Sequence, residues 1–232
     1  MSKLIKELKK ISNQNVATHS ERFFKTAKGE YAEGDKFLGI RVPVLHKIAK
    51  KYTALSLKEI TRLLASHFHE VRLVALFILV KHYEKANLNT KEEIVNLYLS
   101  NIMHINNWDL VDSSAPKILG DFLLDREKDL LYTLATSPNL WERRIAIMAT
   151  FQFIKNEAFD DTLRLSKLLL NDTEDLIHKS VGWMLREVGK KNINLEKEFL
   201  DEHAPKMPRT MLRYAIEKFP PDLRQKYLHS VQ

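Results

Sequence analysis

Residues 104–120 read HINNWDLVDSSAPKILG, and the segment DLVDSSAPKIL within them (109–119) indicates the fold because its pattern recurs along the chain. Four other segments combine a polar break with a helix that has a small residue at a matching place: EVRLVALFILV (70–80), WERRIAIMATF (141–151), LIHKSVGWMLREV (176–188) and PRTMLRYAIEKF (208–219). The small residues that align are Ala75, Ala115, Ala146, Gly182 and Ala215. Their period of about 31 to 40 residues is that of paired-helix solenoids such as HEAT and armadillo repeats.

Partner helices lie between these segments and have apolar residues at i, i+3 and i+4: SLKEITRLLAS (56–66), TKEEIVNLYLSNI (90–102), REKDLLYTLAT (126–136) and DDTLRLSKLLLN (160–171). Ser56 with Glu59, and Thr90 with Glu93, have the spacing of capping boxes and predict two helix starts. Pro116 falls inside a second helix of a repeat and predicts a kink or a restart there.

The composition agrees with an all-helical chain that has a large core. Of the 232 residues, 44% are hydrophobic, and only six are Gly and seven are Pro. We predict an all-α fold, a right-handed α-solenoid of HEAT-like helical repeats with a concave basic groove. We also predict a single domain over 1–232, because there is no flexible linker and the segment KFLGIRVPVLHKIAKKY (36–52) is too apolar, at Leu38, Ile40, Val42 and Val44, to be one.

Charge and cysteine content limit the possible partners and compartments. Lys and Arg number 37 against 30 acidic residues, a formal net charge of +7 that favours a polyanionic partner. The absence of cysteine excludes disulfides and thiolate metal sites. No signal peptide or membrane-spanning stretch is evident, so we expect a soluble protein of the cytoplasm, associated with the nucleoid.

The second helices of the repeats concentrate aromatic and basic residues. Trp108, Trp141 and Trp183 occur in three successive repeats, accompanied by Arg72, Arg143, Arg144, Lys179, Arg186, Lys190, Arg209 and Arg213. Lys179, Arg186 and Lys190 lie at helical spacings around Trp183. They are interpreted either as a solvated face with aliphatic stems over apolar neighbours or as phosphate ligands, and the net charge favours phosphate binding.

Trp108 and Asp112 are four residues apart, so on a helix they share one face. One interpretation is structural: Asn107 caps the helix, Asp109 and Asp112 favour its positive end, and Trp108 is core. The other interpretation is a site where an indole lies beside a carboxylate. Three features favour the site: the polar pair Ser113 and Ser114, the break at Pro116, and the occurrence of Trp183 at nearly the same repeat phase two repeats later.

The segment SHFHEVR (66–72) contains His67, His69 and Glu70, which could be metal ligands. No matching cluster of ligands occurs elsewhere, so a loop with ordinary surface histidines is the better interpretation, and we predict no metal and no cofactor. A phosphate-binding Gly loop is also absent, which removes support for nucleotide hydrolysis.

NNWDLVDSSAP (106–116), LWERRIAI (140–147) and VGWMLREVG (181–189), in this order in a helical repeat protein, resemble the AlkD-type DNA alkylation repair glycosylases. The segment 36–52 is also similar to the one by which that family enters its repeats, and the resemblance spans roughly residues 20 to 220. It implies that Asp112 is the catalytic carboxylate and that Trp108 and Trp183 are aromatic walls beside it.

The same resemblance implies DNA-binding roles. Arg144 matches the family's DNA-backbone arginine, with Arg143 as the alternative if the alignment is displaced by one residue. Arg41 replaces the neutral polar residue that often follows FLGI in the family, which would alter contact with the lesion or with the opposite strand. The implied partner is duplex DNA with alkylated purines, bound without a base-flipping pocket, so tolerance of bulky or charged adducts is expected. A monomer is the expected state of a solenoid with a groove.

The chemistry of such lesions explains why one acid and two indoles would suffice. A purine alkylated at N3 or N7 is cationic and already a good leaving group, so the enzyme only has to stabilise positive charge on the sugar and place a water molecule. Two alternatives stay open, a helical repeat scaffold that binds a protein and a family relative that binds DNA without catalysis, because a fold does not confer an activity.

Overall fold

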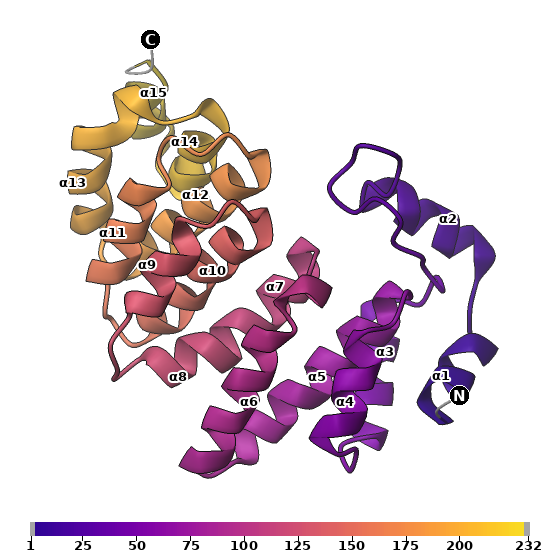
Figure 1. Ribbon diagram of the computed structural model, residues 1–232. Coiled ribbons are helices and arrows are strands. Elements are labelled where there is room, and N and C mark those ends of the chain that lie inside the picture. Colours follow the sequence, from indigo (N-terminus) through magenta and orange to yellow (C-terminus); the bar gives the residue numbers. More distant parts are fainter. Residues whose placement is uncertain (1–2, 230–232) are drawn as a thin grey trace. The chain divides into compact units, whose positions relative to one another are not determined.

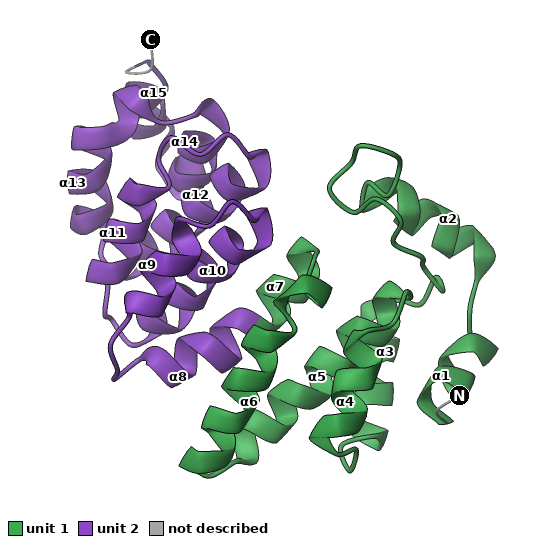
Figure 2. Ribbon diagram, in the orientation of Figure 1, with its two compact units in different colours: residues 1–114 green, residues 115–232 purple. Residues whose placement is uncertain are grey.

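The computed structural model describes residues 3–229, and nearly all of its regular structure is helical (Figure 1). The predicted all-α class is confirmed, since no strand occurs among these residues and Lys36 and Phe68 form only an isolated bridge. The chain divides into two compact units, residues 1–114 and 115–232 (Figure 2). The single domain expected over 1–232 stays a prediction, and so do the handedness of the solenoid and its concave groove.

Unit 1 consists of short helices around one long, almost completely buried helix. In order they are α1 (Lys3–Lys10), α2 (Gln14–Phe23), α3 (Val42–Lys51), α4 (Leu57–Leu64), α5 (His69–Lys85), α6 (Leu88–Ser100), the 3-10 turn η1 (Ile102–His104) and α7 (Trp108–Ala115). α5 packs against α3, α4 and α6. It is apolar on all sides from Leu73 to Val80, as expected of a helix with neighbours all around it.

Unit 2 repeats a helix pair. It contains the π-helical turn η2 (Pro116–Gly120), α8 (Asp121–Leu123), α9 (Asp129–Ala135), α10 (Leu140–Lys155), α11 (Asp160–Leu168), α12 (Asp175–Lys191), α13 (Ile193–His203), η3 (Ala204–Lys206), α14 (Arg209–Ala215), η4 (Ile216–Lys218) and α15 (Pro221–His229). α9 packs on α10 and α11 on α12, while α10, α12 and α14 contact one another in succession. This is the arrangement of a helical repeat.

The aligned small residues all lie on second helices of the repeats. Ala75, Ala115, Ala146 and Ala215 are fully buried, and Gly182 occupies the same place on α12. A Cβ atom on Gly182 would lie 2.3 Å from the backbone oxygen of Met211 and 2.6 Å from Cβ of Tyr214. At Gly182 the small residue is therefore a packing requirement, because a side chain there would fit only if α12 and α14 shifted apart.

Of the helix boundaries predicted from short motifs, those at Ser56 and Pro116 are confirmed and that at Thr90 is not. The capping box of Ser56 and Glu59 starts α4 as predicted, with both reciprocal hydrogen bonds present. The capping box predicted at Thr90 is wrong: Asn87 is the N-cap of α6, and its side chain accepts a hydrogen bond from the backbone N–H of Thr90. Pro116 interrupts the helix as predicted, and the interruption takes the form of the π-helical turn η2.

None of the helices between residues 3 and 229 has the length and apolarity needed to cross a bilayer.

Replacement of Gly182 by Ala tests the close contact between α12 and α14. Overpacking costs about 1–3 kcal/mol, whereas Ala gains about 1 kcal/mol over Gly in a helix interior. Because the nearest atom is a backbone oxygen, which cannot turn aside, we expect a net loss of about 1–2 kcal/mol in the free energy of unfolding, measured by urea denaturation. Ala at exposed Lys191 on the same helix is the control. Equal or greater stability of Gly182→Ala would contradict the packing described.

Candidate functional site

Trp108 and Asp112 lie one turn apart on α7, and both are partly buried. The helix starts at Trp108, whose backbone N–H donates to Oδ1 of Asn107 at 2.8 Å. Leu110 and Val111, on other faces of the helix, are fully buried and fix its rotation. The indole and the carboxylate therefore share the face of α7 that the sequence predicted.

Ser114 does not support the site in the way the sequence suggested. The polar pair Ser113 and Ser114 favoured a site because two serines are unusual in a helix of the core. Ser114 is nevertheless fully buried and hydrogen-bonded. Its hydroxyl donates to the carbonyl of Leu110 at 2.6 Å and lies 3.1 Å from the hydroxyl of Tyr98. The serine is a satisfied core residue on the side of α7 that packs into the unit.

An aromatic stack supports the Trp108 ring. Phe24 stacks on the indole with ring centroids 5.3 Å apart, and Phe23 contacts the indole edge-on at 6.0 Å. Phe24 also stacks on Phe37 at 5.1 Å, which in turn stacks on the imidazole of His69 at 4.6 Å. The stack joins the end of α2, the following loop and the start of α5 to the first residue of α7, so the indole is held from one side.

A buried cluster of charged groups lies at the other end of this stack. Nε2 of His69 lies 2.8 Å from Oδ2 of Asp109, and its Nδ1 lies 3.2 Å from Oδ2 of Asp35. Nη2 of Arg72 donates to both carboxylate oxygens of Asp35, at 2.8 and 2.7 Å, and to Oδ1 of Asn106 at 3.0 Å. The His69 side chain is 2% exposed and that of Asp109 14%, so solvent screens this cluster weakly.

The cluster keeps His69 protonated. Burial by itself would lower the pKa of His69, but the negative charge of Asp109 and hydrogen bonds from Asp109 and Asp35 outweigh it and raise the pKa to about 9. The pKa of Asp35 is lowered, because hydrogen bonds and the positive charges of His69 and Arg72 outweigh burial. The folded-state pKa of His69 is above the unfolded value of 6.5. Its contribution to stability is therefore complete below pH 6.5 and is lost as the pH rises through about 9.

The loop before α3 is fixed by a second buried acid. The carboxylate of Glu70 accepts hydrogen bonds from the backbone N–H groups of Leu38, Gly39 and Ile40, at 2.9, 2.8 and 3.2 Å. Gly39 has φ +75°, and a Cβ there would lie 2.0 Å from the backbone oxygen of Asn13. The loop is thus packed and is not a free linker, as the sequence predicted for Leu38 and Ile40.

Arg41 follows this loop and is exposed at the N-cap of α3. It lines an open depression of about 700 Å³ together with residues of α2 and with Ile40, Val42 and Pro43. Val42 and Val44 are 47% and 40% exposed, so their apolar character does not reflect burial, although both belong to a helix and not to a free linker. They sit in the first turn of α3, beyond the segment that Glu70 holds against the unit.

Trp183 lies in the middle of α12, in unit 2, and is partly buried. Its indole N–H donates to Oε1 of Glu187 at 3.0 Å, and its ring centroid is 6.1 Å from that of Phe151. The expectation that it shares the repeat phase of Trp108 is wrong: Trp108 is the first residue of its helix, whereas Trp183 directly follows the small residue Gly182.

The three basic residues around Trp183 each contact an acidic side chain. Lys179 Nζ lies 2.6 Å from Asp175, Lys190 Nζ lies 2.6 Å from Glu187, and Arg186 pairs with Glu217. The Lys179 and Lys190 side chains are 39% and 48% exposed, so these pairs are of the surface kind that contributes little to stability.

Arg143 and Arg144 are more enclosed. Arg143 donates from Nε to Asp172 at 2.6 Å and from Nη1 to the carbonyl of Ser137 at 2.9 Å. Arg144 is 4% exposed and donates from Nη1 to the carbonyl of Leu176, so it connects α10 to the first turn of α12. Both arginines connect α10 to neighbouring segments of unit 2 by hydrogen bonds. The structure thus brings together Trp108 with Asp112 in unit 1 and places Trp183, Arg143 and Arg144 in unit 2, while the convergence of the two groups stays a prediction.

Sequence reasoning missed most of the support around Trp108. Phe24, Phe37 and Asp35 were not singled out, and the interpretation of His69 as an ordinary surface histidine is wrong because it is 1% exposed. One signal was available: three ionisable residues, His69, Glu70 and Arg72, directly precede the apolar run of α5, where each needs a buried partner. Among the described residues no group of three His, Asp or Glu could hold a metal ion.

Residues 4–219 of the chain match the protein family described as DNA alkylation repair enzyme. A predicted DNA alkylation repair enzyme from Enterococcus faecalis has a similar structure, with 17% identity over 90% of this chain and 97% of that one and a TM-score of 0.69. The structure of smu.31 from Streptococcus mutans UA159 is 22% identical over 91% of this chain and 98% of its own, with a TM-score of 0.52. AlkD2 from Streptococcus mutans is 21% identical, over 90% and 98%, also with a TM-score of 0.52.

Because these solved structures are only 17–22% identical to the chain, the similarity shows a shared fold and nothing finer. No curated protein is significantly similar to the chain.

Titration of His69 by NMR tests the charged cluster. We expect its imidazole to titrate with a pKa of about 9, above the ordinary 6.5, because the carboxylates of Asp109 and Asp35 stabilise the imidazolium. Asp109→Asn should lower that pKa, and Asp125→Asn, at an exposed site of unit 2, should not change it. A pKa of His69 at or below 6.5 in the unmodified protein would contradict the cluster.

Proposed function

Because the chain belongs to the family of DNA alkylation repair enzymes, we propose that it is a DNA glycosylase that hydrolyses the N-glycosidic bond of cationic N3- and N7-alkylated purines in duplex DNA. The observation that carries this proposal is the pairing of Trp108 and Asp112 on one face of α7, with the indole supported from behind by Phe24. A carboxylate beside an aromatic face suits a positively charged sugar and base.

Asp112 acts on charge that develops during the reaction. As the bond between C1′ and the purine nitrogen breaks, its electron pair leaves with the base, which becomes a neutral alkylpurine, and positive charge moves to the sugar. The ionised carboxylate stabilises this oxocarbenium-like sugar and accepts a hydrogen bond from the water that attacks C1′. The proton that this water loses passes to the carboxylate or to solvent. No general acid is required, because the alkylated base leaves without further protonation.

The support around Trp108 adds preorganisation. Electrostatic stabilisation is effective when the groups that provide it do not have to reorganise during the reaction. The first turn of α7 is fixed twice, through the stack on Trp108 and through the hydrogen bond between Asp109 and the His69 imidazolium. Asp112 lies one turn further along the same helix, so its backbone is held in place by the same contacts.

Unit 2 supplies the remaining residues of the proposal. Trp183 is the second aromatic wall, and Lys179, Arg186 and Lys190 contact DNA phosphates by exchanging their carboxylate partners. Arg144, with Arg143 beside it, is the proposed backbone arginine, and Arg41 of unit 1 contacts the lesion or the opposite strand. The proposed enzyme acts as a monomer and uses neither a metal nor a cofactor.

Release of 7-alkylguanine and 3-alkyladenine from alkylated duplex DNA tests the role of Asp112. Loss of one preorganised electrostatic group typically lowers the rate of the chemical step about 10²- to 10³-fold, so we expect a loss of that size in single-turnover base release by Asp112→Asn. Duplex affinity should change little. Asp125→Asn is the matched control, since it removes the same charge at an exposed position.

The three interpretations of the chain give different results in this assay. Equal release by the unmodified protein and Asp112→Asn would remove Asp112 from the mechanism. Duplex binding without release by either would identify a binder that lacks catalysis, and absence of duplex binding would leave a protein scaffold.

A further inference from the structure

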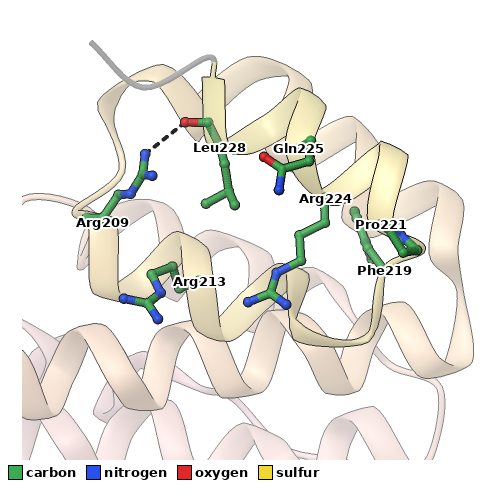
Figure 3. A pocket seen from close by; sticks show the side chains of 7 residues that line it. All are labelled: Arg209, Arg213, Phe219, Pro221, Arg224, Gln225 and Leu228. Carbon is green, nitrogen blue, oxygen red and sulfur yellow. Dashed lines mark hydrogen bonds between the residues drawn. The ribbon is translucent and has the colours of Figure 1, made fainter.

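A pocket of about 450 Å³ lies between α14 and α15, at the end of unit 2 (Figure 3). The residues that line it are Arg209, Arg213, Phe219, Pro221, Arg224, Gln225 and Leu228. Arg209 and Arg213 come from α14, and Arg224 extends from α15 toward α14. Three of the seven side chains are cationic and none is acidic.

Two of these arginine side chains have no partner among residues 3–229. Arg209 donates from Nη1 to the carbonyl of Leu228 at 2.8 Å, which ties α15 to the start of α14. No hydrogen bond or ion pair to a described residue forms at the guanidinium of Arg213 or Arg224. They differ in this from Lys179, Arg186 and Lys190, each of which pairs with a carboxylate.

Among the residues that line the pocket, Arg224 is the one with an unsatisfied buried donor. Its Nε is buried and makes no hydrogen bond to a described residue. An unsatisfied buried donor costs about 1–3 kcal/mol, and more when the group is charged. A guanidinium in this state is stabilised by an anion whose oxygens accept from Nε and Nη together, as those of a phosphate group do.

The pocket continues toward the helix that contains Trp183. Arg213 and Arg224 also line a second depression of about 500 Å³, together with Asp175 and Lys179 of α12, Thr210 and Tyr214 of α14, and Glu217. Its two carboxylates are paired, Asp175 with Lys179 and Glu217 with Arg186. α12 and α14 pack directly against each other. A polyanion that contacts Lys179 would therefore find Arg213 and Arg224 next along the same surface of unit 2.

We propose that Arg213 and Arg224 form a phosphate-binding site for the backbone of duplex DNA, next to the phosphate contact of Lys179. This inference rests on the proposed function, because it takes DNA as the ligand. The site reads the backbone and not the bases: Phe219, the aromatic residue of the pocket, is 8% exposed and offers little ring surface for stacking. Its contribution to DNA affinity is therefore independent of sequence and lesion.

The salt dependence of affinity for undamaged duplex DNA tests the site. Removing a cation that neutralises one phosphate reduces the slope of log K against log[salt] by about 0.9, so Arg213→Gln with Arg224→Gln should reduce it by about 1.8 and weaken binding about tenfold or more near physiological salt. The control is Lys206→Gln with Lys226→Gln, which removes two positive charges from exposed positions of unit 2 outside the pocket. An unchanged slope in the arginine variant, or an equal change in the control, would overturn the proposal.

A second measurement does not depend on DNA. Inorganic phosphate added to the unmodified protein at constant ionic strength should shift the Nε–Hε resonance of Arg224, with a dissociation constant in the millimolar range as befits a fragment of the ligand. If this shift occurs but the protein does not bind duplex DNA, both the proposed function and the DNA assignment fail, and the pocket belongs to a free phosphate compound. If DNA binds and no shift occurs, this inference fails while the proposed function stands.

Discussion

The buried imidazolium of His69, held between the carboxylates of Asp35 and Asp109, is the interaction on which the geometry of unit 1 depends. It links three segments that are far apart in sequence: the loop before α3, the first turn of α5 and the first turn of α7. Arg72 adds a second cation on Asp35, so two positive groups face two negative groups and the cluster is balanced within itself. Removing one member of such a buried set costs about 3–5 kcal/mol, because its partner is left charged and unpaired.

The cluster and the aromatic stack act on the same helix turn by different physical means. The stacked rings of His69, Phe37, Phe24 and Trp108 contribute dispersion contacts and burial. The hydrogen bond from His69 to Asp109 depends on orientation, so it fixes how the first turn of α7 is rotated. Together they leave α7 little freedom to rotate about its axis. This is the physical reason why Trp108 and Asp112, which are only partly buried, can hold a fixed arrangement without a ligand.

Regular features of the fold were predictable from the sequence because they depend on neighbours along the chain. Four features are of this kind: the helical periodicity, the cap at Ser56, the break at Pro116 and the repeated small residue, which at Gly182 allows close contact with α14. Trp108 and Asp112 could be placed on one face for the same reason. Their spacing on a helix does not depend on what packs against it.

Features that depend on contacts between distant segments were not predictable. The position of His69 before the apolar run of α5 indicates a need for buried partners, but it does not identify them as Asp35 and Asp109, which are 34 and 40 residues away. Lys179, Arg186 and Lys190 were recognised as a basic group, but their carboxylate partners, including Glu217 on a different element, were not. The capping of α6 by Asn87 instead of Thr90 is a smaller failure, because two nearby polar residues both have the side chain of an N-cap.

The central claim, that Asp112 stabilises positive charge on the sugar, is tested most directly by affinity for duplexes with a stable mimic in place of one deoxyribose. One duplex carries a cationic pyrrolidine and the other a neutral tetrahydrofuran of the same shape. The unmodified protein should prefer the cationic ring by about tenfold or more, equivalent to about 1.4 kcal/mol, and Asp112→Asn should lose this preference. The same preference in both proteins would show that the charge is stabilised elsewhere, and would contradict the mechanism.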